Sequence, residues 1–403
     1  MHGFAENKRE AGASPARSRH CVDRSSPGRA RPSQTPPPRA PSTGRRNPGG
    51  PHERPLRQAG PLITPPSAAA YASARERLAA LAKPTGALGH LEDAAAWVAA
   101  CQGVSPPRPL DRVRLTVLAG DHGVSHAGVS AYPREVTGAM VAAMVGGGSG
   151  ANVLARQHGV TMQVLDVGVD ADLTGLPAEV RRHHVRRSSG AIDREDALSA
   201  AEVHRALAVG AAIASEEVAA GADLLVLGDL GIGNTTPAAA LVAATFGVGA
   251  DEVTGRGTGV DDAALARKTQ VVAAALARAG DRTNDPYERL AALGSADLAA
   301  GVGFLLGAAR AGVPVLLDGI VTVAELAVAA DLEPGVVAWC AAGHRSTEPA
   351  QQLALDKLGL VPLLDVGLRL GEGTGALTAL PVLRSAVLLL REMALLADLA
   401  PPA

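Results

Sequence analysis

The sequence predicts an α/β fold, a Rossmann-like parallel sheet with helices on both faces, together with a small helical domain. Short, continuously apolar segments recur along the chain, as expected for strands that are buried on both faces. Long Ala- and Leu-rich segments separate them, and this alternation implies a parallel sheet. The 403 residues are 47% hydrophobic and 2% aromatic, so a large core must consist mainly of aliphatic side chains.

Each element follows from a local pattern. A helix is expected over 200–219, which is rich in Ala, and a second over 261–279. Asp261 is a good N-cap for the second helix, and Gly280 follows its last residue, where glycine is common. A third, mostly apolar helix is expected over 377–399. Five buried strands are expected, at 115–118, 162–166, 224–227, 313–317 and 336–339.

The first 60 residues differ in composition from the rest. They hold 12 Lys and Arg against 4 Asp and Glu, and 10 of the 28 prolines, whereas the other 343 residues hold 26 against 36. So few large apolar side chains cannot offset the entropy cost of ordering, and we expect 1–60 to be a disordered basic tail. The expected domains are a helical segment over 61–110, an α/β domain over 111–370 and a C-terminal helical segment over 371–403.

Composition also narrows the class of protein. Eight aromatic residues and a net charge of −2 disfavour nucleic-acid binding, although a nucleic-acid-binding arm at 1–60 stays open. Three scattered cysteines without a CxxC motif predict neither a zinc site nor disulfides, and they fit a reducing cytoplasm. The uncharged runs 136–155 and 230–250 carry glycine clusters, so we expect no membrane span.

Polar residues and glycines follow all five expected strands. In a parallel sheet, ligands bind beyond the carboxyl ends of the strands, so we expect one site along this edge. The alternative is that these residues only form turns. The segments concerned are 120–123, 166–170, 228–237, 318–320 and 343–349.

The strongest of these segments is 228–237, with the sequence GDLGIGNTTP. Its glycines allow backbone N–H groups to approach an anion, and Asn234 and Thr235 add donors. Pro237 suits the first turn of a helix, whose N-terminus attracts phosphate. The segment is neither GxxxxGK[ST] nor GxGxxG, which disfavours a nucleoside triphosphate or dinucleotide site. A tight turn without a ligand is the alternative.

Two further glycine-rich segments are candidates for phosphate contacts. The segment 255–259, which contains Gly257, precedes a helix that carries Lys268, so loop and side chain together suit a phosphate or sugar. A lysine on a helix more often faces solvent. The segment 146–150 forms either another anion-binding loop or a turn between helices.

The segment 371–375, GEGTG, places Glu372 between glycines just ahead of a helix, with Thr374 as a candidate N-cap. Glycines allow a flat ligand to approach the backbone closely. Glu372 is therefore a candidate general base, with its pKa lowered by the positive helix end and raised by burial. The alternative is a surface Glu in a loop that leads into a helix.

Together, 120–133, 228–237 and 371–375 resemble the nicotinate-nucleotide–dimethylbenzimidazole phosphoribosyltransferases, which act in assembly of the lower ligand of cobalamin. The similarity is collinear from about residue 81 to about 399. It implies that nicotinate mononucleotide and 5,6-dimethylbenzimidazole give α-ribazole 5′-phosphate and nicotinate. It also implies no cofactor, no metal and a homodimer.

The resemblance implies a role for each matching residue. Glu372 matches the family's general base, Lys268 matches its lysine, and Asp229 stands where a Glu is usual. The phosphoribosyl site would include Gly231, Asn234, Thr235 and Gly257; further nucleotide contacts would be His344, Arg345 and Ser346; the base pocket would include Val129, Tyr132 and Met140, with Tyr132 at a variable position.

Three rival functions are weighed against this one. A transferase that uses phosphoribosyl pyrophosphate usually has paired acids at a strand end, and 316–322 holds only Asp318. A relative that activates a phenol or another benzimidazole stays open, since pocket walls decide the acceptor. A non-catalytic nucleotide-binding regulator is disfavoured by Glu372.

Overall fold

The computed structural model describes residues 62–399, so the expected tail 1–60 lies outside the described residues. These residues form a five-stranded parallel sheet with the strand order β2-β1-β3-β4-β5. This confirms the expected α/β class. The strands are β1 (Val113–Gly120), β2 (Thr161–Gly168), β3 (Leu224–Leu230), β4 (Val315–Leu317) and β5 (Cys340–Ala342).

The fifth expected strand was placed too early. Residues 336–339 lie in the 3-10 helix η3 (Pro334–Trp339), and β5 begins at the next residue, Cys340. Pro334 fixes the backbone at a helical φ and lacks an N–H, which favours a helical turn. The apolar run continues unbroken from this turn into β5, so apolar character alone does not separate the two.

Helices cover both faces of the sheet because alternate strand residues point to opposite sides. Leu225 and Leu227 of β3 face a core with α6 (Ala200–Ala219), α7 (Thr235–Phe246), α11 (Ala296–Arg310) and α12 (Ile320–Leu332). Leu224 and Val226 face the second core. That core contains residues of α3 (Val136–Val145), α4 (Gly150–His158) and α14 (Thr374–Glu392).

Two of the expected helices are confirmed, together with the caps predicted for the second. Helix α6 spans the expected residues and begins with a capping box between Ser199 and Glu202. Helix α9 (Asp262–Ala279) begins where Asp261 accepts a hydrogen bond from the Ala264 N–H at 2.8 Å, and Gly280 ends it. The remaining elements are η1 (Gly123–Ala127), α5 (Ala178–Arg181), α8 (Ala250–Val253), η2 (Gly280–Asn284), α10 (Pro286–Leu293), α13 (Pro349–Leu358) and η4 (Leu396–Leu399).

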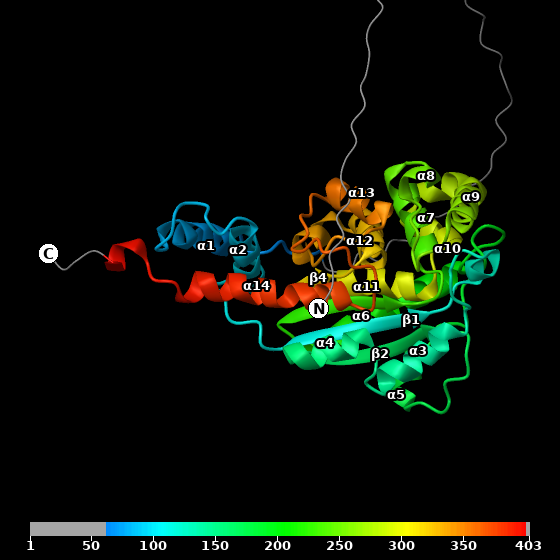
Figure 1. Cartoon of the computed structure of the whole chain (residues 1–403), viewed down its shortest axis with the longest axis horizontal. Helices are drawn as coiled ribbons and strands as arrows, with labels where there is room; N and C mark the ends of the chain where they lie inside the picture. The colour runs from blue at the N-terminus through cyan, green and yellow to red at the C-terminus, as the bar shows by residue number, and fades with distance from the viewer. Residues whose placement is uncertain (1–61, 400–403) are drawn as a thin grey trace, which may run out of the picture. The chain divides into compact units, whose positions relative to one another are not determined.

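Helices α1 (Ala68–Ala80) and α2 (His90–Gln102) and the C-terminal part of α14 form a helical layer at one end of the described chain. Helices α1 and α2 pack against α14, beside its C-terminal part (Figure 1). The Arg77 guanidinium donates to the Leu390 carbonyl at 2.7 Å and thereby satisfies an unpaired group at the helix C-terminus. These helices come from the segments expected to form the small domain, although the domain boundaries themselves stay a prediction.

The third expected helix ends earlier than predicted. Helix α14 stops at Glu392, and the chain is extended at Met393. Leu395 then forms an antiparallel bridge with Leu81, which requires an extended backbone. This contact joins the two ends of the folded chain, so local sequence does not reveal it.

Two helical stretches are long and apolar enough to cross a membrane by length and composition, Val136–His158 and Thr374–Glu392. The first is in fact two short helices, α3 and α4, separated by a glycine-rich turn at 146–149. The second is α14, which packs against α2, α4 and β3. Length and composition therefore single out one packed helix, α14, and one stretch that is not a continuous helix.

Candidate active site

Loops from the carboxyl ends of the strands are tied together by hydrogen bonds. The loop after β1 reaches the 255–259 loop, where the Ala131 N–H donates to Thr258 Oγ1 at 2.9 Å. Arg369 Nη1 donates to the Gly257 carbonyl at 3.2 Å, and the Glu372 N–H donates to the Asp229 carbonyl at 3.3 Å. Segments that are far apart in the sequence therefore meet at the edge where a site was expected.

Glu372 lies in a left-handed turn. Its φ is +64°, between Gly371 at +84° and Gly373 at +86°. A non-glycine residue in this region is uncommon and is held there by its surroundings. A Cβ at Gly228 would lie 2.7 Å from the Glu372 carbonyl carbon, so β3 approaches the turn as closely as glycine permits.

The Glu372 side chain is buried, with the residue 5% exposed, which excludes the surface-loop alternative. Its Oε2 accepts a hydrogen bond from the Ala151 N–H at 3.4 Å, at the N-terminus of α4. Burial raises the pKa of Glu372, while the Ala151 N–H and the Ser149 hydroxyl lower it, and the net pKa lies above the ordinary value. Both expected influences act, but the helix end belongs to α4, not to the helix that follows Glu372.

The N-cap expectation for Thr374 is wrong. The N-cap of α14 is Gly373, which has no side chain, and the Thr374 hydroxyl donates to the Gly371 carbonyl at 2.7 Å. Asp318, at the end of β4, takes over the capping role. Its Oδ2 accepts from the Gly373 N–H at 3.1 Å, and its Oδ1 accepts from the Gly375 and Ala376 N–H groups at 2.8 and 3.1 Å.

Asp229 points inward from the end of β3. Its Oδ1 accepts a hydrogen bond from Asn234 Nδ2 at 2.6 Å, and the residue is 6% exposed. Burial and the nearby Asp297 raise the pKa of Asp229 well above the ordinary value. The structure thus pairs two predicted substrate-binding residues with each other, beside a second buried acid.

Behind Asp229 lies a buried polar cluster, which we define as Asp229, Asp297, Glu325 and His122. His122 Nε2 lies 3.3 Å from Asp297 Oδ2. Burial raises the pKa of Asp297, but the neighbouring His122 outweighs it, and the net pKa is lowered. Glu325 is completely buried in α12, and burial together with Asp229 and Asp297 raises its pKa well above the usual range. The cost of unpaired charge in a buried site is the common cause of the raised pKa of Asp229 and Glu325.

Lys268 is completely buried rather than solvated. Its Nζ donates to Thr235 Oγ1 at 2.7 Å, at the start of α7. Burial lowers the pKa of Lys268, and the nearby Glu348 raises it, with a net lowering. Gly257, at φ +50°, passes over this pair, and its N–H donates to Glu348 Oε1 at 2.8 Å. The structure therefore brings together three predicted site residues and one, Glu348, that was not predicted.

The predicted residues after β5 are placed differently from one another. His344 is buried, with Nε2 at 3.6 Å from Asp318 Oδ1. The Arg345 side chain is 43% exposed and lies 3.7 Å from Asp365. Ser346 Oγ accepts from the Glu348 N–H at 3.3 Å. His344 and Ser346 thus support the loops, whereas Arg345 points to the surface.

The predicted base-pocket residues are also divided. Val129 is buried and lies beside Gly233, where a Cβ would be 3.7 Å from its Cγ2. Met140 is half-buried against the second core, and Tyr132 is 57% exposed. Gly231 lies where a Cβ would overlap the Gly120 carbonyl and the His122 ring, so that position requires glycine.

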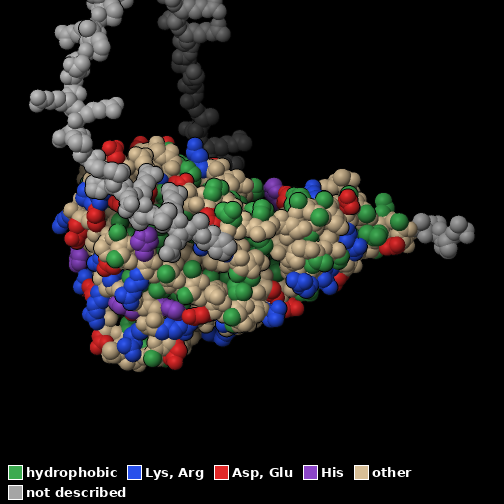
Figure 2. All heavy atoms as spheres, turned by 180° about the vertical axis from the view of Figure 1, so that it is seen from behind, with side chains coloured by type: hydrophobic (Ala, Val, Ile, Leu, Met, Phe, Trp, Pro, Cys, Tyr) green, Lys and Arg blue, Asp and Glu red, His purple; other side chains and the backbone are tan. Residues whose placement is uncertain are grey.

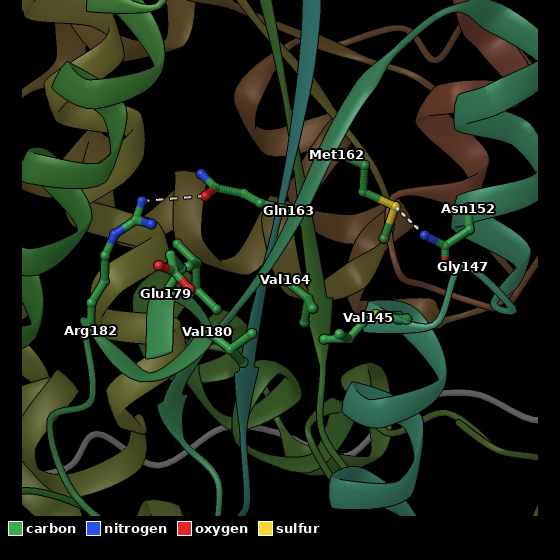
Figure 3. Close-up of a pocket in the computed structure, with 11 residues that line it drawn as sticks. Val145, Gly147, Asn152, Met162, Gln163, Val164, Glu179, Val180 and Arg182 are labelled. Carbon is green, nitrogen blue, oxygen red and sulfur yellow. Dashed lines mark hydrogen bonds between the residues drawn. The ribbon is translucent and has the colours of Figure 1, made fainter. Parts of the chain in front are cut away.

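Two cavities of the described chain lie away from these loops. One of about 280 Å³ lies between α3, α4, α5 and the edge strand β2, with Met162, Gln163 and Arg182 in its wall (Figure 3). The other, of about 510 Å³, lies at the amino ends of the strands. Neither is lined by a predicted site residue, so the site is assigned from the meeting of the loops.

The 146–150 segment is the turn between α3 and α4, which matches one of the two structures expected for it.

Comparisons with known proteins identify the family. A family model described as "Phosphoribosyltransferase" matches residues 63–399. A nicotinate-nucleotide–dimethylbenzimidazole phosphoribosyltransferase of Mycobacterium marinum is 53% identical over 336 residues, which are 83% of this chain and 93% of that relative. One of Mycobacterium tuberculosis is 52% identical over 332 residues, 82% and 91% of the two chains. The chain belongs to this phosphoribosyltransferase family.

A solved structure agrees with the family. The crystal structure of CobT from Thermus thermophilus is 43% identical, covers 83% of this chain and 100% of its own, and gives a TM-score of 0.79. The chain is therefore a transferase with the fold of this phosphoribosyltransferase family, and the resemblance inferred from the motifs is confirmed.

Four buried carboxyl residues at or near the site were not among the predicted site residues. Asp318 and Glu348 lie in the segments 318–320 and 343–349 that follow expected strands, whereas Asp297 and Glu325 are isolated acids in Ala- and Leu-rich stretches. Glu325, for instance, interrupts the run VTVAELAVAA, where a charged residue needs a special reason to be buried. The four are Asp297, Asp318, Glu325 and Glu348.

Proposed function

We propose that this chain transfers the phosphoribosyl group of nicotinate mononucleotide to 5,6-dimethylbenzimidazole, giving α-ribazole 5′-phosphate and nicotinate, in cobalamin nucleotide-loop assembly. The observation that supports this reaction is Glu372. It is a buried carboxylate in a left-handed turn at the carboxyl edge of the sheet, in a chain whose relatives carry the name of this activity.

Glu372 suits the role of general base. As the glycosidic bond breaks, nicotinate leaves with a neutral ring nitrogen, so no acid is needed there. The benzimidazole attacks through one nitrogen, and its other nitrogen must lose a proton as the new bond forms. A carboxylate within hydrogen-bond reach accepts that proton. The raised pKa of Glu372 makes it a stronger base, while the Ala151 N–H keeps its ionised form accessible.

The residues around Lys268 suit the phosphoribosyl group. Lys268 and Thr235 present a buried cation and a hydroxyl, and Gly231, Asn234 and Gly257 belong to the adjoining loops. A bound phosphate would add the negative charge that a buried lysine requires. His344, Arg345 and Ser346 complete the nucleotide contacts in this proposal, with Val129, Tyr132 and Met140 beside the flat ring.

The proposed reaction uses no metal and no cofactor, because the charge that develops in the transition state is positive and the leaving nitrogen is neutral. We further propose a cytoplasmic homodimer. Apolar side chains are exposed on the helical end, among them Tyr71, Leu388 and Leu396, and hydrophobic side chains are visible on that end in Figure 2. Exposed apolar groups that gather in one region suit a protein interface.

The first test is Glu372→Gln, which preserves shape and removes the basic oxygen. We expect kcat to fall by about 10²- to 10⁴-fold, measured as release of nicotinate in the presence of dimethylbenzimidazole. Glu288→Gln, an exposed residue of α10, is the matched control and should keep wild-type turnover. An unchanged kcat/KM in E372Q would refute the base assignment.

The same assay tests the rival acceptors. A phenol or another benzimidazole in place of dimethylbenzimidazole reports which flat acceptor the pocket prefers. Faster nicotinate release with a phenol would assign the chain to the rival activity. Turnover with phosphoribosyl pyrophosphate in place of nicotinate mononucleotide would overturn the proposed donor.

A further inference from the structure

The start of α14 is capped by a residue that is distant in sequence. Asp318 accepts hydrogen bonds from three N–H groups of Gly373, Gly375 and Ala376, at 2.8 to 3.1 Å. The first N–H groups of a helix have no partner within the helix, so an outside acceptor must satisfy them. Here a single carboxylate serves the turn that directly follows Glu372.

That turn does not hold its shape through local bonds alone. Glu372 and both neighbouring glycines are left-handed, and the cap position, Gly373, has no side chain. Gly375 packs against the His344 ring so closely that a Cβ would overlap it. The conformation at Glu372 is therefore supported by contacts with the ends of β3, β4 and β5.

Asp318 is itself held on two sides. Its N–H donates to Thr322 Oγ1 at 3.0 Å, within the first turn of α12. Its carbonyl accepts from Gln351 Nε2 at 3.3 Å, and Gln351 Nε2 also donates to the His344 carbonyl at 2.8 Å. With 3% of its surface exposed, Asp318 is a fixed acceptor rather than a mobile surface group.

We propose that Asp318 is a positioning residue for the transfer reaction: it binds the first-turn N–H groups of α14 and thereby holds the Glu372 carboxylate in its working place. This inference rests on the proposed role of Glu372 as the base. Asp318 acts on the backbone next to Glu372 and has no assigned contact with substrate. The charge of Asp318 also acts on the base, because it raises the pKa of Glu372.

The test is Asp318→Asn, which keeps the shape but removes the charge and one of the two oxygen acceptors. A small misplacement of a reacting group can cost about 10²-fold in rate, so we expect kcat to fall by about ten- to a hundredfold. KM for nicotinate mononucleotide should change by less than about twofold, since the residues around Lys268 are untouched.

The pH profile separates positioning from a general loss of structure. Removing the negative charge lowers the pKa of Glu372, so the acid limb of kcat should move to lower pH in D318N. The other ionisable groups close to Asp318 are His344 at 3.6 Å and the nearby Asp229. Neither belongs to the turn that carries Glu372, and both are present in every variant compared.

Asp166 provides a matched control. It is also buried at a strand end, where its Oδ1 accepts from the Val169 N–H at 2.8 Å, but among the described residues it has no hydrogen bond to 371–376. Asp166→Asn should lower stability without moving the acid limb of kcat. An equal shift of that limb in D166N, or an unshifted limb and wild-type kcat in D318N, would overturn the role of Asp318.

The two proposals fail in different ways. If E372Q keeps its turnover, the base assignment fails. If E372Q loses turnover while D318N behaves as wild type, the base assignment stands and the positioning role fails.

Hydrogen exchange of the wild-type protein keeps the inference testable if D318N does not fold. The amides of Gly375 and Ala376, in the first turn of α14, should exchange as slowly as those of mid-helix residues. First-turn amides normally lack such protection, so fast exchange at both would overturn the proposal.

Discussion

Two groups of buried carboxyl residues lie along the same edge of the sheet and differ in how their oxygens are satisfied. Both oxygens of Asp318 accept backbone N–H groups, and Glu372 accepts one from Ala151. In the buried polar cluster, neither oxygen of Glu325 has a hydrogen-bond partner among the described residues, and one oxygen of Asp229 has none. Backbone N–H groups thus stabilise the carboxylates of Asp318 and Glu372, whereas burial raises the pKa of Asp229 and Glu325.

This difference shows that a buried carboxyl group is not a candidate general base merely because it is an acid. A carboxyl group that burial keeps protonated cannot accept a proton from substrate, however close it lies. Asp229 is the acid of the cluster that adjoins the predicted site, and its raised pKa suits it to hydrogen bonding rather than proton abstraction. Glu372 combines a raised pKa with a backbone donor, which is what the base role requires.

The largest expected effect on stability comes from Asp297→Asn in the buried cluster. His122 would lose the carboxylate that lies 3.3 Å from its Nε2 in a buried site. Breaking a buried pair by removing one partner costs about 3 kcal/mol. Urea unfolding at pH 7 measures the change, and a loss below about 0.5 kcal/mol would show that the pair contributes little.

Gly375→Ala tests the other group. The added methyl group overlaps the His344 ring, so the start of α14 must shift. Overpacking of this kind costs about 1–3 kcal/mol, and the shift should also lower kcat because Glu372 lies three residues before the change. Thermal unfolding and nicotinate release measure the two effects. Gly359→Ala is the control, because an added Cβ at this helix end meets open space. We expect this variant to keep wild-type turnover, so that any effect of a Gly→Ala change on stability alone can be measured.

Glu325→Gln should change stability the least of the three variants, and it should raise stability where the other two lower it. The pKa of Glu325 is raised in the folded protein, so its contribution to stability is complete below the ordinary Glu pKa. That contribution is lost as pH rises above the ordinary value, because the unfolded chain then releases the proton that the folded chain retains. E325Q has no ionisable group at this position and cannot show this loss of stability. We therefore expect E325Q to be more stable than wild type by about 1 kcal/mol at pH 8, with a smaller advantage at pH 5.

Urea unfolding at the two pH values decides this point. Equal pH dependence in E325Q and wild type would mean that Glu325 ionises in the folded state, and the contrast between the two groups would then disappear.

Local pattern predicted the elements whose boundaries are set locally. Helix α9 spans Asp262–Ala279 because Asp261 caps its N-terminus and Gly280 its C-terminus. The error at 336–339 arose because an apolar 3-10 turn and an apolar strand have the same composition. The error at the end of α14 arose because Leu395 pairs with Leu81, a contact that no local window contains.

The site was predictable to a similar degree. The segments that follow the strands were expected along one edge, and the structure brings 255–259 and the Glu372 turn to the same loops. The partners that hold them could not be predicted, because Asp318, Glu348 and Ala151 become neighbours only through tertiary packing. Glycine spacing predicts where a backbone can approach a ligand, but not which distant carboxylate caps it.

Helix α14 also connects parts of the chain that differ in kind. It begins beside Glu372, and its far end packs against α1 and α2 (Figure 1). Its 19 residues extend about 28 Å, and an α-helix is stiff along its axis. A tilt of about 5° at the α1–α2 end would therefore displace the other end by about 2 Å, so the α1–α2 layer and the turn that carries Glu372 are geometrically coupled through one helix.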